Sequence, residues 1–184
     1  MVVFMLGGWF VGKYNTMVIA NETVNEKWAQ VENVYQRRAD LIPNLVATVK
    51  GYATHEQETL QGVVEARAKA TSTTIDAGNM DAAAMQKFQS AQQGLSSALS
   101  RLMVVVEKYP DLKANQNFLE LQAQLEGTEN RIAVERKRFN EAAKTYNLSI
   151  RMFPNSMLAG MYGFEKREYF KAEETAKTAP KVEF

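Results

Sequence analysis

A stripe of apolar residues, spaced alternately four and three apart, is the feature of this chain that most constrains its fold. The stripe comprises Val24, Trp28, Val31, Tyr35, Ile42, Leu45, Val49 and Tyr52. This spacing is the heptad pattern of helices that pack side by side with a slight left-handed twist. It predicts an all-α fold in which long helices form a bundle.

Pro43 lies inside the stripe. A proline within a helix removes one backbone hydrogen bond and clashes with the preceding turn, so the helix either kinks or breaks. Asp40 is available to cap a new helix after a break, but no glycine lies beside it to form a turn. The stripe also keeps its register on both sides of the proline. We therefore predict one long helix over residues 21–71, kinked near Pro43, with a helix–turn–helix as the alternative.

Two further helices are expected. Residues 72–79 are rich in capping and turn formers and are few enough to join antiparallel neighbours. The second helix follows them and ends at Tyr109-Pro110, and the third ends at Pro154. The third helix carries apolar residues at the same three-four spacing, among them Phe118, Leu121, Leu125, Ile132, Phe139 and Tyr146.

The lengths of these helices predict the shape of the molecule. At 1.5 Å per residue they would be about 75, 45 and 60 Å long, which describes a slender rod. An up-down-up path would place the end of the third helix away from the start of the chain. Three unequal helices leave apolar strips partly uncovered, so we expect self-association, with a self-sufficient monomeric bundle as the alternative.

Arg38 occupies the one position of the stripe, between Tyr35 and Ile42, that is not apolar. A charge at such a position must find a partner or lie at the edge of the bundle. A glutamate of the third helix, such as Glu129, is a plausible partner. We interpret this pair as a buried polar contact that fixes the register of the helices, rather than as a substrate-binding site.

The composition excludes several kinds of chemistry. The chain has no cysteine and a single histidine, His55, so thiolate nucleophiles and His-rich metal sites are excluded. No Glu-x-x-His pair, phosphate-binding loop or Ser-His-Asp set occurs. The net charge of +1 provides no basic field for nucleic acid. We therefore expect no enzyme activity, no cofactor, no metal and no nucleic-acid partner.

The first twenty residues indicate a membrane. Residues 1–12 carry no charged side chain, Lys13 follows, and residues 14–20 are again mostly apolar. A helix over residues 1–20 would be about 30 Å long, which matches the hydrocarbon core if Lys13 extends towards the headgroups. We predict a single-pass membrane helix here, with a buried helix start or an interfacial segment as alternatives.

Several residues of this segment suit a membrane helix. Trp9 and Tyr14 fit the interfacial belt of aromatic residues. Gly8 and Gly12 match the close-packing motif of membrane helices, although two glycines at this spacing are common by chance. Lys13 and Lys27 favour a cytoplasmic body by the positive-inside rule, but two lysines leave the side of the membrane undetermined.

Two long blocks of the sequence are distinctive. In the first block, residues 35–46 read YQRRADLIPNLV; in the second, residues 109–115 read YPDLKAN and residues 125–132 read LEGTENRI. Both blocks resemble the LemA family of bacterial membrane proteins. The closing Tyr169-Phe170 and Pro180-Lys181-Val182 also resemble the family. This resemblance implies one N-terminal membrane helix followed by a long antiparallel helical bundle, in a bacterium, and no established catalytic residues. The apolar start is shorter here than the family's anchor.

These observations divide the chain into an N-terminal membrane anchor (residues 1–20), a long helical bundle (21–153) and a C-terminal tail (154–184). The tail begins with an apolar patch formed by Met157, Leu158, Met161, Tyr162 and Phe164. Such a patch is expected to dock on the bundle or on a neighbouring subunit, with contact to a membrane as the alternative.

The predicted function follows from this division. We expect a non-enzymatic scaffold of the bacterial cell envelope, anchored once in the cytoplasmic membrane, that assembles with copies of itself or with another envelope protein. The alternative is a lipid-binding or membrane-remodelling protein.

Overall fold

The computed structural model describes the backbone of residues 2–78 and 80–171, and their side chains from residue 7 onward. Its helices are α1 (Val2–Lys50), α2 (Gln57–Ser72), α3 (Ala82–Val106), α4 (Pro110–Lys113), α5 (Gln116–Arg151) and α6 (Asn155–Tyr162). No strand occurs in this part of the chain. The predicted all-α class is therefore confirmed.

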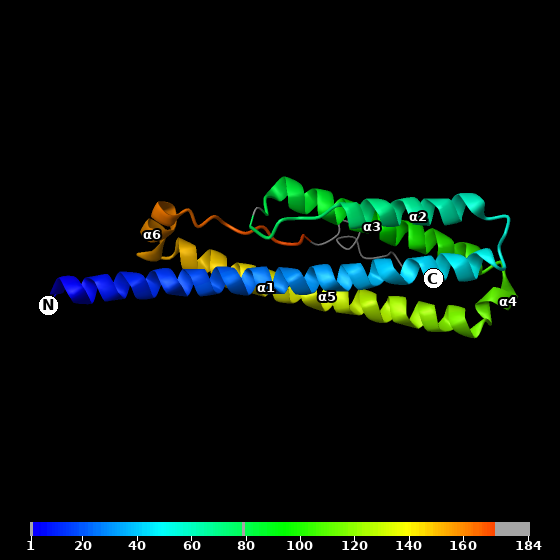
Figure 1. Cartoon of the computed structure of the whole chain (residues 1–184), viewed down its shortest axis with the longest axis horizontal. Coiled ribbons are helices and arrows are strands. Elements are labelled where there is room, and N and C mark those ends of the chain that lie inside the picture. The colour runs from blue at the N-terminus through cyan, green and yellow to red at the C-terminus, as the bar shows by residue number, and fades with distance from the viewer. Residues whose placement is uncertain (1, 79, 172–184) are drawn as a thin grey trace, which may run out of the picture.

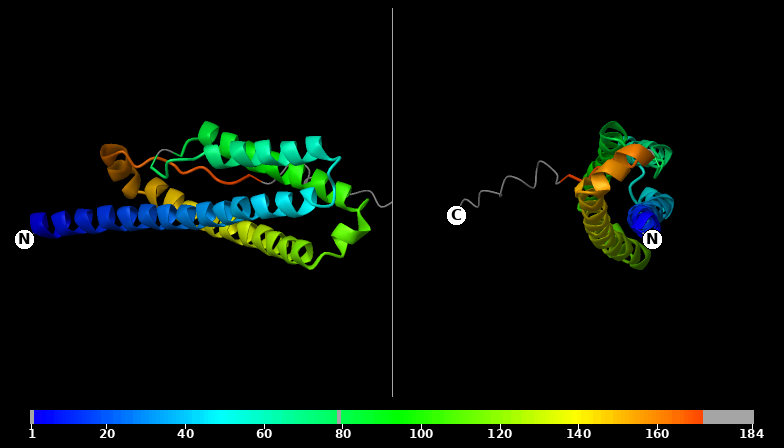
Figure 2. Two further views of the ribbon diagram at one scale, coloured as in Figure 1. Left: turned by 45° about the vertical axis from the view of Figure 1, so that its right-hand side comes forward. Right: turned by 90° about the vertical axis from the view of Figure 1, so that its left-hand side faces the viewer.

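The helices form an elongated bundle (Figure 1). α1 and α5 run antiparallel and pack along much of their length, and α2 and α3 form a hairpin that lies against α1. The end-on view of Figure 2 shows α1 in contact with α5 on one side and close to the α2–α3 hairpin on the other. The first turns of α1 extend past the rest of the bundle at one end of the rod.

The predicted helix over residues 21–71 is wrong in its second half. α1 does continue through Pro43, whose side chain lies on the exposed side of the helix, but it ends at Lys50. The chain reverses over residues 51–56, where the Gly51 amide donates to Ala47 O at 3.3 Å and the Ala53 amide donates to Val49 O at 2.8 Å. α2 then folds back beside α1. The bundle therefore has four long helices instead of the three that we predicted.

This additional reversal changes which helix ends lie at the same end of the rod. The end of the third predicted helix was expected away from the start of the chain, and this expectation is also wrong. α5 ends towards the beginning of α1, and in α6, which follows α5, the Tyr162 ring lies 4.9 Å from the Tyr14 ring of α1. One extra antiparallel helix is sufficient to reverse the direction of every element that follows it.

The connections after α2 agree with the predicted turns. In the segment between α2 and α3, the Asp76 carboxylate accepts the Gly78 amide at 2.9 Å. Asp81 caps α3 by accepting the Ala84 amide at 2.7 Å, and Asn115 caps α5 by accepting the Phe118 amide at 3.0 Å. These caps satisfy amide groups that have no partner within a helix.

The interior consists of two apolar clusters that follow one another along the rod. The proximal core lies towards the start of α1 and contains Met17, Val24, Trp28, Val31, Tyr35, Ile75, Met80, Met85, Phe88, Ile132, Phe139, Ala143, Tyr146, Ile150, Leu158, Ala159 and Phe170. The distal core lies towards the 51–56 turn and contains Ile42, Leu45, Val49, Ala53, Leu60, Val63, Ala70, Leu95, Ala98, Leu99, Leu102, Val106, Leu112, Phe118 and Leu125.

The predicted membrane-spanning helix over residues 1–20 is not supported. None of the helices that the structure describes combines the length and the apolar character needed to cross a membrane. In the sequence, the polar residues Lys13, Asn15 and Thr16 separate the two apolar stretches of this segment.

Candidate functional site

A layer of polar side chains separates the proximal core from the distal core. At its centre is Arg38 of α1, which is only 1% exposed. Its Nη1 atom donates to Glu129 Oε1 of α5 at 2.5 Å and to Ser96 Oγ of α3 at 3.0 Å. Its Nη2 atom donates to Gln92 Oε1 of α3 at 2.6 Å. The structure thus brings together Arg38 and Glu129 as predicted from the sequence, but only Arg38 is buried, because the Glu129 side chain is 47% exposed.

The polar layer links all four long helices. The Gln92 amide group donates to the Ala70 carbonyl near the end of α2 at 3.2 Å, so Gln92 joins α2 to the contacts of Arg38. The guanidinium also lies 5.1 Å from the centre of the Tyr35 ring. Because a buried charge is stabilised only in the register that supplies its partners, this layer favours one alignment of the helices along the rod.

A polar groove of about 350 Å³ opens above this layer, between α3 and α5. Arg38 and Glu129 lie at its floor, and glutamine and serine side chains of α3 line its wall. The one acidic group of the layer, Glu129, is already paired with Arg38. Over the residues that the structure describes, no group of three or more His, Cys, Asp or Glu side chains is placed to hold a metal ion. Charged side chains of α5 and of the chain that follows α6, namely Arg136, Glu168 and Lys171, also line the groove.

Two asparagines of α5 hold the chain that follows α6. We call residues 164–171 the strap, because they run extended along the bundle (Figure 2). Asn147 accepts the Arg167 amide at 2.8 Å and donates to the Arg167 carbonyl at 2.8 Å. Asn140 does the same for Phe170, at 2.9 and 3.1 Å. Each asparagine thus satisfies both backbone groups of one strap residue, as a neighbouring strand would.

Arg167 of the strap reaches across the bundle to α1. Its Nη2 atom donates to Asn21 Oδ1 at 2.8 Å, and its Nη1 atom donates to the Ala77 carbonyl. Burial raises the pKa of the neighbouring Tyr146 phenol, an effect that the Arg167 charge opposes. The strap thereby connects α1, α5 and the segment before α3 by hydrogen bonds.

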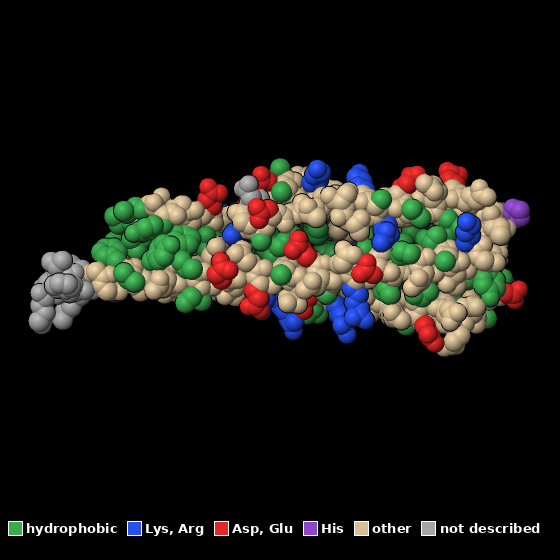
Figure 3. Space-filling view, viewed as in Figure 1, with side chains coloured by type: hydrophobic (Ala, Val, Ile, Leu, Met, Phe, Trp, Pro, Cys, Tyr) green, Lys and Arg blue, Asp and Glu red, His purple; other side chains and the backbone are tan. Residues whose placement is uncertain are grey.

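An exposed apolar surface covers the end of the rod where the chain starts. It surrounds a groove of about 860 Å³, and we call it the apolar tip. α1 contributes Trp9, Phe10, Val11 and Tyr14, and the α5–α6 connection and α6 contribute Phe153, Pro154, Met157, Leu158, Met161 and Tyr162. Figure 3 shows hydrophobic side chains gathered over this end, while charged side chains appear farther along the rod.

The predicted interface residues lie mostly inside the bundle. Those of α1 from Val24 to Val49 are buried, as are Phe118, Leu125, Ile132, Phe139 and Tyr146. Leu121 is half-buried, and Tyr52 is an exception at 44% exposed. Tyr52 belongs to the 51–56 turn, where its hydroxyl accepts a hydrogen bond from Asn115 at 2.9 Å. A Cβ added at Gly8 or Gly12 would meet no atom within 4 Å, so the structure places no packed helix against either glycine.

His55 and the apolar patch of the tail also have defined places. His55 is exposed in the 51–56 turn and is not part of a helix. In the tail, Leu158 is buried in the proximal core and Phe164 packs against it, whereas Met157, Met161 and Tyr162 are exposed. The patch therefore docks on the bundle with one side only.

The strap contacts were not predicted from the sequence. Arg167, Asn140 and Asn147 were not singled out as candidate residues. A signal was present, because Phe139-Asn140 and Tyr146-Asn147 repeat an aromatic–asparagine pair seven residues apart on α5. An asparagine that recurs beside a buried stripe indicates that its side-chain amide forms hydrogen bonds with another part of the protein and not with water.

Comparison with known proteins identifies relatives over most of the chain. A model of the LemA family matches residues 27–184. The magnetosome protein MamQ 2 of Paramagnetospirillum magneticum is 30% identical over 183 residues, covering 90% of this chain and 67% of that protein. The magnetosome protein MamQ of Magnetospirillum gryphiswaldense is 31% identical, covering 86% of this chain and 64% of the relative.

A more distant relative carries the family name itself. The protein LemA of Metamycoplasma hominis is 22% identical over 165 residues, covering 90% of this chain and 72% of that protein.

Proposed function

The chain belongs to the LemA family, and we propose that it is a non-enzymatic helical scaffold attached to a bacterial membrane through the beginning of α1. The observation that carries this proposal is the exposure of the apolar residues at the start of α1. Trp9, Phe10 and Val11 are 43%, 44% and 59% exposed, and they line the groove of the apolar tip together with residues of α6. Exposed apolar patches of this kind mark surfaces that contact a membrane or another protein.

The nature of the polar clusters supports a scaffold rather than an enzyme. Arg38 and Arg167, the two buried arginines, are engaged with side chains and carbonyl groups of the chain itself. The contacts of Arg38 join α1 to α3 and α5, and those of Arg167 join the strap to α1 and to the segment before α3. These contacts are structural. An elongated bundle whose buried arginines are held by contacts within the chain is suited to position other molecules.

The proposal includes self-assembly. α1 and α5 extend beyond the α2–α3 hairpin, so their apolar residues near the start of α1 lack the cover that the hairpin gives elsewhere (Figure 1). A second copy of the chain that packs against these apolar residues is one way to bury them. Sedimentation of the detergent-solubilised chain over a range of concentrations tests this part: a single monomeric species at every concentration would contradict it.

Membrane attachment is tested by fractionating bacterial cells that express the full chain. We expect the chain in the membrane pellet, and we expect the triple variant Trp9→Ser, Phe10→Ser and Val11→Ser to move largely to the soluble fraction. The matched control replaces three exposed apolar residues on the flanks of the rod, Val64, Val104 and Val134, with serine. The control is expected to stay in the membrane pellet, and recovery of the unchanged chain in the soluble fraction would contradict the proposal.

A further inference from the structure

We infer that α6 is a second membrane-contacting element, whose exposed face inserts into the interface of an anionic lipid bilayer beside the beginning of α1. This inference rests on the proposed membrane attachment, and it adds a contact made by a part of the chain more than a hundred residues away in sequence. Four observations support it: the two faces of α6, its position along α1, the charges around it and its continuity with the apolar start of α1.

α6 has one face in the protein and one face outside it. Leu158 and Ala159 are 7% and 5% exposed and belong to the proximal core. Met157, Met161 and Tyr162 on the other side are 65%, 76% and 60% exposed. A short helix with a fixed inner face and an outer face of methionine and aromatic side chains has the form of an interfacial membrane helix.

Contacts with α1 fix the level of α6 along the rod. The Tyr14 ring lies 4.9 Å from the Tyr162 ring and 5.7 Å from the Phe164 ring. α1 begins at Val2, and at 1.5 Å per residue its start lies about 18 Å beyond Tyr14. A bilayer that receives the first turns of α1 therefore meets Trp9, Tyr14 and α6 near its headgroup region, where tryptophan and tyrosine are favoured.

The charges around the apolar tip suit an anionic surface. Residues 1–21 and 142–164 contain no aspartate or glutamate, whereas three basic residues, Lys13, Lys144 and Arg151, lie within them. Lys13 sits 5.8 Å from the centre of the Trp9 ring, and Arg151 is exposed in the last turn of α5. Glu165 is the next acidic residue, after the chain has turned at Gly163 to run back along the bundle. Basic groups close to a bilayer are attracted to anionic lipids.

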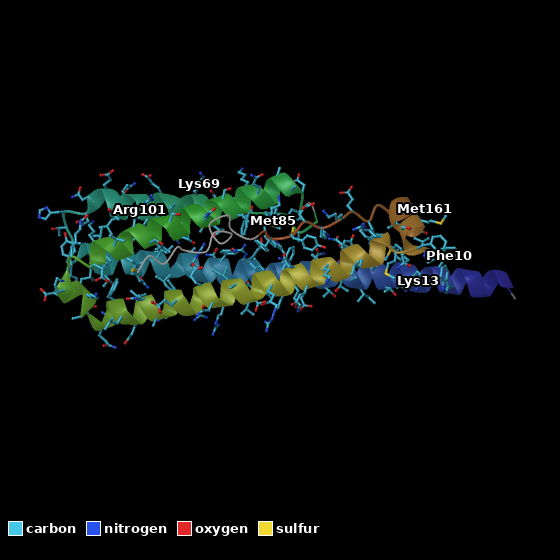
Figure 4. The ribbon with its side chains drawn as sticks, turned by 180° about the vertical axis from the view of Figure 1, so that it is seen from behind. Phe10, Lys13, Lys69, Met85, Arg101 and Met161 are labelled. Carbon is cyan, nitrogen blue, oxygen red and sulfur yellow. The ribbon has the colours of Figure 1, made fainter. Side chains whose placement is uncertain are left out.

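Figure 4 shows how these residues lie. Phe10 and Lys13 of α1 and Met161 of α6 are found at the same end of the molecule, with Met161 directed outward. The apolar surface of α6 is thus continuous with that of α1, because both line one groove. A flat bilayer is able to contact both elements at once.

The absence of cysteine from the sequence allows a direct test with the full chain. Met161→Cys, labelled with an environment-sensitive fluorophore, is mixed with vesicles of phosphatidylcholine, with or without phosphatidylglycerol. We expect a blue shift and an increase in emission that are larger when phosphatidylglycerol is present. Val104→Cys, labelled in the same way on an exposed position of α3, is the matched control and is expected to stay unchanged.

Flotation of the same vesicles provides the second measurement. We expect the double variant Met157→Gln and Met161→Gln to bind phosphatidylglycerol vesicles roughly tenfold more weakly, because two apolar side chains no longer enter the interface. Glutamine retains the length and helix propensity of methionine, so α6 is expected to remain folded. Val104→Gln with Val134→Gln is the control and should bind as the unchanged chain does.

The outcomes separate this inference from the proposed function. If the unchanged chain floats with vesicles but the label at position 161 does not respond and the methionine variant binds equally well, attachment occurs through α1 alone and the inference is overturned. A response of the label that depends on protein concentration, without vesicles, would instead identify contact between copies and also overturn it. Failure of the unchanged chain to float would overturn both proposals.

Discussion

The proximal and distal cores of the rod are of similar extent, but they are built in different ways. The distal core is almost entirely aliphatic, and among its buried residues Phe118 is the one aromatic side chain. Its residues come from helices and from the turns between them. The proximal core contains six buried aromatic side chains among its aliphatic residues and methionines, and one of the six, Phe170, belongs to the strap and not to a helix.

Aromatic packing in the proximal core converges on Trp28. Its ring stacks on Phe170 at 5.9 Å and meets Phe88 and Phe139 edge-on at 5.3 and 5.5 Å. These partners come from α3, α5 and the strap, so one side chain of α1 contacts three other parts of the fold. The distal core is therefore complete once the helices and the turns between them pack, whereas the proximal core is complete only when the strap is in place.

The largest expected effect comes from removing the centre of the proximal core. Trp28→Ala should lower the free energy of unfolding by about 3–5 kcal/mol, as large-to-small changes at buried aromatic residues do. Urea denaturation followed by circular dichroism measures this loss. Trp9→Ala is the matched control, because the chain has two tryptophans and Trp9 is 43% exposed. A loss for Trp28→Ala no greater than that of the control would contradict the central role of Trp28.

A second prediction concerns the polar layer between the two cores. Glu129→Ala should lower the free energy of unfolding by about 2 kcal/mol, because it leaves the buried Arg38 guanidinium without its charged partner. Glu126→Ala, an exposed glutamate one turn earlier on α5, should change stability by less than about 0.5 kcal/mol. Chemical denaturation measures the free energy of unfolding of both variants. An equal loss of stability in the two variants would show that the polar layer does not hold the cores together.

Local sequence patterns predicted much of this fold, because the turn of a single helix decides which residues share its buried face. The three-four spacing identified the buried residues of α1 and α5, and the turn formers at 72–79 and Pro110 marked real helix boundaries. The proposal that Arg38 meets Glu129 was possible because a charge in an apolar stripe requires a partner.

The same patterns failed where the outcome depended on tertiary contacts. Pro43 was the one place where a break of the first helix was considered, and α1 does continue through it, because a proline on the exposed side of the helix is tolerated there. The real reversal begins at Gly51, and it is stabilised by burial of Ala53 in the distal core, which no local pattern shows. The strap was missed because an extended segment carries no helical periodicity, and its hydrogen-bond partners lie on another element.

A third prediction tests the dependence of the proximal core on the strap. Asn147→Ala removes the side chain that pairs with both backbone groups of Arg167. We expect a loss of about 1–2 kcal/mol, limited because released backbone groups can bond to water. Hydrogen exchange over residues 164–171 should accelerate together with amides near Trp28, while amides around the distal core stay protected.

Asn130→Ala provides the control for this experiment, because Asn130 is an exposed asparagine on the same helix. Its exchange pattern should match that of the unchanged chain. If Asn147→Ala accelerates exchange equally in both cores, the two cores unfold as one unit and the distinction between them fails.

The smallest expected effect concerns a carboxylate at the edge of the proximal core. Glu32 is half-buried on α1, and burial raises its pKa, with a smaller opposing contribution from Trp28. The folded chain therefore binds this proton more tightly than the unfolded chain does. Consequently the free energy of unfolding should fall as the pH rises from the ordinary pKa of a glutamate through the raised pKa of Glu32.

Glu32→Gln removes this titration and should make the chain slightly more stable at neutral pH, with a flatter dependence on pH in that window. Glu26→Gln is the control, since Glu26 is exposed one and a half turns earlier on α1 and forms only a surface pair with Lys27. Thermal melts across the acidic to neutral range measure both. A stabilisation that is larger near pH 4 than near pH 7 would reverse the expected sign, and it would mean that the proximal core favours the charged form of Glu32 despite its burial.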